Sequence, residues 1–235
     1  MEDVICGESF VGHLVALRRT LLACIAVTVA AYPPCFCLSP YVIDALVRWS
    51  FPESLGPLHY FSPLEAFGAR LQVAAVLALA MAYPWNVFQA WRFLLPALRR
   101  GERRMLGGWI VASSVLFFGG VAFCVWGIIP LLMAFAGSFA SPELIPMLGL
   151  AHFLRLAGWL SLAFALAFQC PVIVLFLVRH GIVSRDALRR KRPYVIVAIL
   201  TMAAILTPPD ILSQAMLALP AWLLFELGLL LAKPP

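Results

Sequence analysis

Residues Leu106–Pro130 read LGGWIVASSVLFFGGVAFCVWGIIP and contain no charged side chain. A helix that crosses the roughly 30 Å hydrocarbon core of a bilayer needs about 20 predominantly apolar residues. This segment is long enough, and five further apolar runs accompany it along the chain. They are Leu21–Leu38, Phe67–Trp85, Phe153–Val178, Tyr194–Leu206 and Ile211–Ala232. The pattern predicts an all-α membrane protein with about six transmembrane helices.

The composition of the whole chain points to the same class of protein. Of its 235 residues, 63% are hydrophobic and 12% are charged, and the mean hydropathy is +0.98. A soluble domain is roughly 45–50% apolar and about 25% charged. The composition therefore excludes a soluble enzyme, a disordered tail and a secreted disulfide scaffold. We expect residues 1–235 to form a single polytopic transmembrane domain.

The basic residues lie in clusters between the apolar runs. With the N-terminus in the cytoplasm, 14 of the 17 Lys and Arg residues fall on the cytoplasmic side, in segments 1–20, 86–105, 179–193 and 233–235. The outer segments then keep Arg48, Arg70 and Arg155. Short cytoplasmic loops of membrane proteins carry this excess of positive charge. The clusters predict that both termini are cytoplasmic, and the net charge of +6 does not indicate nucleic-acid binding.

Prolines suggest where three of the helices end or break. Pro33 and Pro34 lack backbone donors and predict the end of the first helix. Ala45–Ser50 is then expected to form a separate short interfacial helix. Pro171 is expected to weaken the helix of the fourth span, and Pro220 to interrupt the last span. The outer segments 39–65 and 137–152 are expected to form a cap that braces the helices.

The last two spans form a short pair. Tyr194–Leu206 covers roughly 20 Å at 1.5 Å per residue, which is less than the hydrocarbon thickness. A short hairpin must thin the bilayer locally or pack against longer neighbours. We expect local thinning on that side of the molecule.

Gln169 lies deep in the fourth span, and Pro171 follows it. Polar groups at membrane depth are costly, and each is a functional hypothesis by default. One interpretation is a hydrogen bond between helices of the same chain, worth roughly 0.6 kcal/mol. The other is a polar contact for the transmembrane helix of a partner. The sequence favours neither.

Three further polar residues lie near the last span. Asp210 follows two prolines. Its side chain is expected to cap the final helix by accepting hydrogen bonds from the free backbone amides at the start of that helix. Gln214 lies four residues later, on the same helix face. Glu226 is interpreted as a satisfied carboxylate at the helix end.

Glu102 is the single acid of the first cytoplasmic loop, and it is surrounded by four arginines. They are Arg99, Arg100, Arg103 and Arg104. In one interpretation Glu102 neutralises this cluster through exposed pairs worth about 0–1 kcal/mol. In the other it receives a cationic ligand, because a carboxylate binds a guanidinium in a bidentate pair.

The sequence contains no motif for an enzyme, a metal site or a bound cofactor. Phosphate-binding loops and metalloprotease or serine-hydrolase motifs are absent. The histidines lie in loops or at span ends, at positions 13, 59, 152 and 180, with no metal-ligand spacing. Serines 113, 114 and 161 have no evident catalytic base. We expect no catalytic activity and no cofactor.

Seven ordered blocks of the chain form a recognisable series. They are HLVALR at 13–18, FSPLEAF at 61–67, the segment from Tyr83 to Arg103, FQCP at 168–171, KRPY at 191–194, LTPPDILSQ at 206–214 and Leu219-Pro220 with Phe225-Glu226. Together they resemble the TatC family, the multi-span receptor subunit of the twin-arginine protein translocase. The resemblance covers nearly the whole chain. It implies a glove-like concave helical bundle with an extracytoplasmic cap, in the bacterial inner membrane.

The resemblance also implies what the residues bind. The partners would be twin-arginine signal peptides of folded cargo, single-span Tat components of the TatA and TatB type, further copies of this chain in a receptor complex, and membrane lipids. Transport in the family uses the proton-motive force. The signal-peptide surface would comprise Leu17, Arg18, Phe93, Pro96, Glu102 and Arg103, with Glu102 pairing with the signal arginines. Partner helices would dock at Gln169, Asp210 and Gln214.

The chain departs from the family pattern at three positions. Ala16 stands where the N-terminal motif usually has glutamate, Thr20 where a basic residue is frequent, and Gln169 where glutamate is frequent. The resemblance therefore matches one acid, Glu102, to two signal arginines. Glu8, Glu2 and Asp3 are the alternative acids, although no spacing assigns the role to any of them. The alternative functions are a proton- or solute-coupled carrier and a structural membrane scaffold.

Overall fold

The computed structural model describes residues 2–50, 58–59, 62–94, 106–138, 149–206 and 211–232. The described secondary structure is helical, apart from one isolated backbone bridge. The helices are α1 Glu2–Ser50, α2 Pro63–Leu94, α3 Leu106–Phe123, α4 Ile129–Gly137, α5 Leu150–Ala167, α6 Cys170–Arg179, α7 Arg185–Arg190, α8 Arg192–Leu206 and α9 Ile211–Leu231, with one π-helical turn, η4 Cys124–Ile128, between α3 and α4. The predicted all-α class is confirmed.

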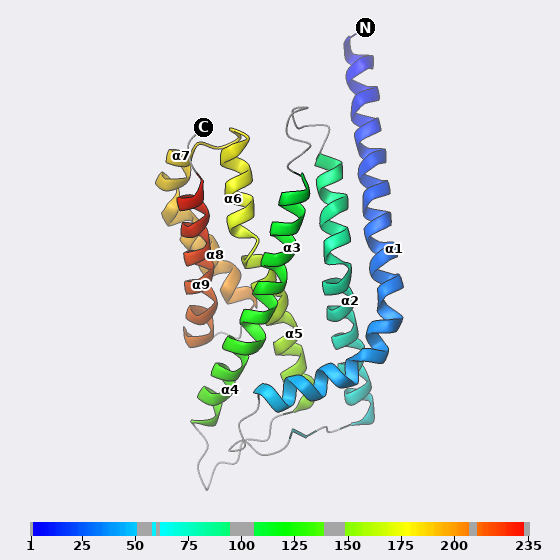
Figure 1. Cartoon of the computed structure of the whole chain (residues 1–235), viewed down its shortest axis with the longest axis vertical. Coiled ribbons are helices and arrows are strands. Elements are labelled where there is room, and N and C mark those ends of the chain that lie inside the picture. Colours follow the sequence, from blue (N-terminus) through cyan, green and yellow to red (C-terminus); the bar gives the residue numbers. More distant parts are fainter. Residues whose placement is uncertain are drawn as a thin grey trace.

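Five stretches of described helix are long and apolar enough to cross a membrane, and α8 is a shorter apolar helix. The five are Leu14–Ser50, Leu64–Phe93, Gly107–Gly137, Leu150–Arg179 and Gln214–Leu231. Figure 1 shows that α1 begins and α9 ends at the same end of the bundle, which we call the terminal end. The opposite end is called the distal end. The short α8 agrees with the expected short fifth span, whereas α9 is long enough to cross a membrane.

The prediction that the first helix ends at Pro33 and Pro34 is wrong. Helix α1 continues through both prolines and through Pro40 to Ser50, so Ala45–Ser50 is its last part and not a separate helix. Proline removes the donor for the carbonyl four residues earlier. For Pro40 this carbonyl is that of Phe36, and the Ser39 hydroxyl donates to it at 2.8 Å. Figure 1 shows α1 bending in its second half and running across the distal end.

Other helix boundaries also differ from the expectation. The third span does not end at Pro130 but continues through η4 into α4. The fourth span breaks at Phe168–Gln169 into α5 and α6, where Pro171 was expected to weaken the helix. The last helix is not interrupted by Pro220, which lies inside a continuous α9. Prolines inside membrane helices are tolerated because neighbouring groups satisfy the freed backbone.

Helix α5 forms the centre of the bundle. Leu154, Leu160 and Phe164 are among its fully buried side chains, and α2, α3 and α9 pack against it. At Gly120 of α3, an added Cβ would lie 2.7 Å from the carbonyl oxygen of Phe164. Small residues at such crossings let two helix backbones approach closely. This close approach fixes α3 against α5.

The last part of α1 packs across the distal end, and described residues of the expected cap meet there. Four apolar residues of α1 pack against the main buried cluster: Val42, Ile43, Leu46 and Val47. The backbone amide of Leu150 donates to the carbonyl oxygen of His59 at 2.8 Å. The two segments expected to form a cap therefore meet at this end, directly before α5 begins.

Candidate functional site

A chain of polar side chains links α2, α3 and the break between α5 and α6. The Ser113 hydroxyl donates to Gln169 Oε1 at 2.6 Å, and Gln169 Nε2 donates to the Ser113 carbonyl at 3.2 Å and to the Ala165 carbonyl at 3.4 Å. The Tyr83 hydroxyl lies 3.0 Å from Ser113 Oγ. A serine hydroxyl has one proton, which goes to Gln169, so Tyr83 is the donor in this contact. We call Tyr83, Ser113 and Gln169 the polar clasp.

The clasp gives Gln169 a role within this chain. Its side chain is 8% exposed, and both ends of its amide are hydrogen-bonded. The intrachain interpretation of Gln169 is therefore realised in the structure. Docking of a partner helix at Gln169 stays a prediction. Tyr83 and Ser113 were not predicted as its partners, although each is a polar group inside an apolar run.

The terminal end carries three of the predicted signal-peptide residues. Asn86 Nδ2 of α2 donates to Thr28 Oγ1 of α1 at 3.3 Å, which fixes the antiparallel register of the two helices. An α-helix rises about 1.5 Å per residue. Phe93 of α2 therefore lies about 10 Å, and Arg18 of α1 about 15 Å, from this contact toward the terminal end. Arg18 and Leu17 are both exposed. Leu17, Arg18 and Phe93 therefore lie at the same end of the neighbouring helices α1 and α2.

Four predicted site residues lie outside the described part of the chain. They are Pro96, Glu102, Arg103 and Asp210. The first three belong to the segment 95–105, which joins the end of α2 to the start of α3. Asp210 precedes α9. Their roles stay predictions.

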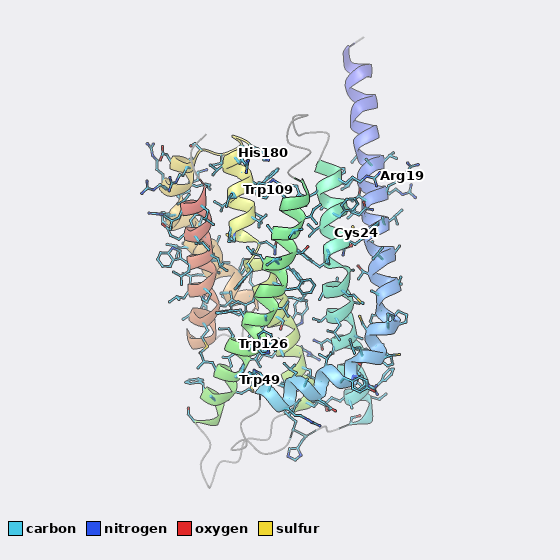
Figure 2. All side chains as sticks on the ribbon, in the orientation of Figure 1. Arg19, Cys24, Trp49, Trp109, Trp126 and His180 are labelled. Carbon is cyan, nitrogen blue, oxygen red and sulfur yellow. The ribbon has the colours of Figure 1, made fainter. Side chains whose placement is uncertain are left out.

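An aromatic cluster at the terminal end was not predicted from the sequence. The ring centroids of Trp91 and Phe176 are 4.8 Å apart, those of Trp91 and Trp109 are 5.8 Å apart, and those of Phe176 and His180 are 4.3 Å apart. Figure 2 shows Trp109 and His180 near each other at the ends of α3 and α6. The cluster joins the ends of α2, α3 and α6, and so holds both helices from which segment 95–105 emerges. Aromatic residues at the ends of apolar runs, typical of membrane interfaces, were the available signal.

The pair α8 and α9 has its own polar contacts. Arg192, at the start of α8, forms an ion pair with Glu226 Oε1 of α9. Glu226 Oε2 is buried without a hydrogen-bond partner among the described residues, so the carboxylate predicted to be satisfied is paired at one oxygen. Gln214 Nε2 donates to the Leu200 carbonyl at 3.1 Å. Gln214 thus contacts the neighbouring helix within the chain, and its predicted contact with a partner helix stays a prediction. Among the described residues, no group of three His, Cys, Asp or Glu side chains is placed to hold a metal ion.

Comparisons with known proteins agree with this architecture. A family model described as Sec-independent protein translocase protein (TatC) matches residues 12–220. The TatC protein of Haemophilus influenzae is 34% identical over 99% of this chain and 92% of its own length. That of Escherichia coli K12 is 32% identical over 96% of this chain and 88% of its own length.

Solved structures resemble the fold as well. A crystal structure described as the twin-arginine translocase receptor TatC has a TM-score of 0.85 and 28% identity, and the match covers 94% of this chain and 98% of that one. A second crystal structure of that receptor, in DDM, has a TM-score of 0.86 and 27% identity, with 94% and 99% of the two chains covered.

Proposed function

The chain belongs to the TatC family of Sec-independent protein translocases, and we propose that it is a receptor for twin-arginine signal peptides of folded cargo proteins. As a member with five long apolar helices, it is an inner-membrane component of a protein-transport system. The finer assignment concerns what it binds and where. It rests on the residues at the terminal end of α1 and α2.

The observation that carries the proposal is the antiparallel register of α1 and α2. The contact between Asn86 and Thr28 brings Leu17 and Arg18 to the end at which α2 leads into segment 95–105. That segment carries Glu102 in the sequence. A signal peptide bound at this end would therefore be within reach of an exposed apolar side chain, Leu17, and of a carboxylate.

The chemistry of the ligand matches these groups. A carboxylate binds a guanidinium through two parallel hydrogen bonds, and lysine cannot reproduce this geometry. Glu102 would bind a signal arginine in this way, while Phe93, Pro96, Leu17, Arg18 and Arg103 shape the surrounding surface. The aromatic cluster supports this role because it holds the ends of α2 and α3, between which Glu102 is attached.

The proposal extends to topology and assembly. Both termini would lie in the cytoplasm, which places the signal-peptide surface where cargo is made. Single-span Tat components of the TatA and TatB type would dock along Gln169, Asp210 and Gln214, and further copies of this chain would join the receptor complex. Transport would draw on the proton-motive force.

The direct test is photocrosslinking to a signal peptide in inverted membrane vesicles from a photoreactive phenylalanine analogue at position 93, which leaves the Glu102 carboxylate intact. An Arg-Arg peptide should crosslink strongly, and the same peptide with Lys-Lys should crosslink about tenfold less, because the bidentate pair is lost. Equal crosslinking of the two peptides would contradict a guanidinium-specific site at residue 102.

Export measures the functional consequence. Glu102→Gln should abolish export of twin-arginine cargo while the amount of protein in the membrane stays normal. Glu65→Gln is the matched control, because Glu65 is an acid at the distal start of α2. Normal export by the Glu102→Gln variant would remove the binding role, and equal loss in both variants would point to a general effect of charge.

A further inference from the structure

Helix α5 carries a row of polar and aromatic residues at its distal end that the transport role does not use. His152, Arg155 and Trp159 are spaced three and four residues apart and lie on one face of the helix. His152 and Arg155 are exposed, and Trp159 is 56% exposed. Together with Leu156 and with Ile205 of α8, they line a hollow of about 410 Å³. We call this hollow the distal basic pocket.

The arginine in this pocket is not neutralised within the described part of the chain. Arg155 is one of three basic residues outside the clusters of the terminal end, and it forms no ion pair with a described side chain. A cation on a membrane-spanning helix is costly unless it reaches water or an anion. The pocket therefore has a charge that an external anion would complement.

The short α8 determines what lies at the level of Arg155. Ile205, at the distal end of α8, lines the same hollow as Arg155 although α5 continues further in the distal direction. Figure 1 shows that α8 and α9 end well short of the distal ends of α4 and α5. A bilayer that thins to match the distal ends of α8 and α9 brings its headgroups to this level. Trp159 fits the same depth, because tryptophan prefers the interface between headgroups and hydrocarbon.

We propose that the distal basic pocket binds the phosphodiester headgroup of an anionic phospholipid in the distal leaflet. The Arg155 guanidinium binds the phosphate oxygens through paired hydrogen bonds, as arginine does with phosphates in general. His152 adds a second donor one turn away, and Trp159 lies beside the glycerol region. Leu156 and Ile205 contact the start of the acyl chains. The volume of the hollow is in the range of small-molecule sites, about 300–1,000 Å³.

The inference is independent of signal-peptide binding, because the pocket lies at the end of the bundle opposite Leu17 and Phe93. It assigns α5 a contact with one lipid molecule beside the short hairpin. A lipid held there would fix the edge at which the bilayer changes thickness.

Native mass spectrometry of the full-length protein in detergent tests the proposal. Delipidated protein is titrated with phosphatidylglycerol and, separately, with phosphatidylcholine of the same chain length. The wild-type protein should bind phosphatidylglycerol more tightly, and Arg155→Gln should weaken that binding about tenfold, the loss expected for a charged hydrogen bond. Binding of phosphatidylcholine, whose choline cation offsets the charge of its phosphate, should be weaker in the wild type and should fall less in this variant. Arg155→Lys, which keeps the charge, should retain part of the affinity.

The matched control is Arg70→Gln. Arg70 is exposed near the distal end of α2, where its guanidinium lies 5.4 Å from the Phe36 ring centroid and not in the pocket. The Arg70→Gln variant should bind both lipids with the affinities of the wild type. Equal phosphatidylglycerol binding by Arg155→Gln and Arg70→Gln would overturn the proposal, and so would equal binding of the two lipids by the wild type. Inorganic phosphate is added as a competitor at the same concentration as the lipid that saturates the pocket. Displacement of phosphatidylglycerol by this phosphate would show that the pocket binds a free anion and would overturn the assignment to a lipid.

Discussion

The polar clasp and the C-terminal hairpin, residues 192–231, are held together by different interactions. In the clasp, Ser113 and Gln169 form neutral hydrogen bonds among buried groups at the centre of the bundle. In the hairpin, the main polar contact is the ion pair between Arg192 and Glu226, which are partly exposed. The clasp joins three long segments of the bundle, whereas the hairpin packs mainly on α6.

The difference follows from distance to water. Deep in the bilayer a charge is expensive, and a neutral amide or hydroxyl must find its partner within the protein. Glu226 lies in the second half of α9 and Arg192 at the start of α8, and both positions are toward the terminal end. A pair near the interface can hold charges at small cost. Each region also contains a glycine at which two helices approach closely. Gly120 lies against α5 beside the clasp, and Gly228 lies against α6 in the hairpin.

Substitution of Gly228 in the hairpin should have the largest effect on the stability of the protein. A Cβ on Gly228 would lie 2.8 Å from Pro171 Cα of α6. Gly228→Leu should therefore push α9 away from α6 and destabilise the protein by about 1–3 kcal/mol or more. Thermal unfolding of the purified protein measures this effect. Gly127→Leu is the control, because a Cβ at Gly127 meets open space. Equal melting temperatures of the two variants would contradict the close packing.

The ion pair should have the next largest effect. Glu226→Gln removes the partner of Arg192 and should cost about 1 kcal/mol, because both side chains are partly solvated. The double variant with Arg192→Gln should recover part of this loss, since no charge is then left unpaired. Asp186→Asn, an exposed acid of α7 at the same end, is the matched control. A Glu226→Gln protein as stable as Asp186→Asn would mean that packing alone holds the hairpin.

The clasp should contribute less than the ion pair if its hydrogen bonds have the average strength of those between membrane helices. Hydrogen bonds between membrane helices are worth about 0.6 kcal/mol on average and at most about 1.7 kcal/mol. A double-mutant cycle of Ser113→Ala and Gln169→Leu should give a coupling energy in this range. Ser114→Ala is the control, because the Ser114 hydroxyl is buried without a hydrogen-bond partner among the described residues. A coupling near zero would show that the clasp does not hold α3 to α5 and α6.

Gln214 should have the smallest effect on stability. Its hydrogen bond to the Leu200 carbonyl is exposed, so Gln214→Ala should change the free energy of unfolding by less than about 0.5 kcal/mol. Crosslinking of the hairpin to a single-span Tat helix should nevertheless fall if Gln214 is a docking residue. Thr201→Ala on α8 provides the comparison. Unchanged crosslinking in Gln214→Ala would leave Gln214 with its intrachain contact alone.

Much of the helical layout could be predicted from the sequence. The uncharged run at Leu106–Pro130 and the short run at Tyr194–Leu206 both appear as helices close to their expected places. The prolines misled the prediction at Pro33, Pro34 and Pro220, because a local rule for soluble helices does not include the groups that satisfy a freed carbonyl. Pro40, in the same helix as Pro33 and Pro34, gives an example: the hydroxyl of Ser39 donates to the carbonyl of Phe36, which Pro40 leaves without its helical donor.

The sequence by itself determined that this protein lies in a membrane and which segments are helices. The reason is that a bilayer offers the backbone no hydrogen-bond partners, so every long apolar run must form its own. Tertiary structure alone decided which side chains meet. Gln169 is hydrogen-bonded to Ser113, which is 56 residues away, and Arg155 and Ile205 line the same hollow because α5 and α8 pack together. Contacts between helices depend on how each helix is rotated about its axis and on its register with its neighbour. The pattern of apolar residues along the chain predicts neither.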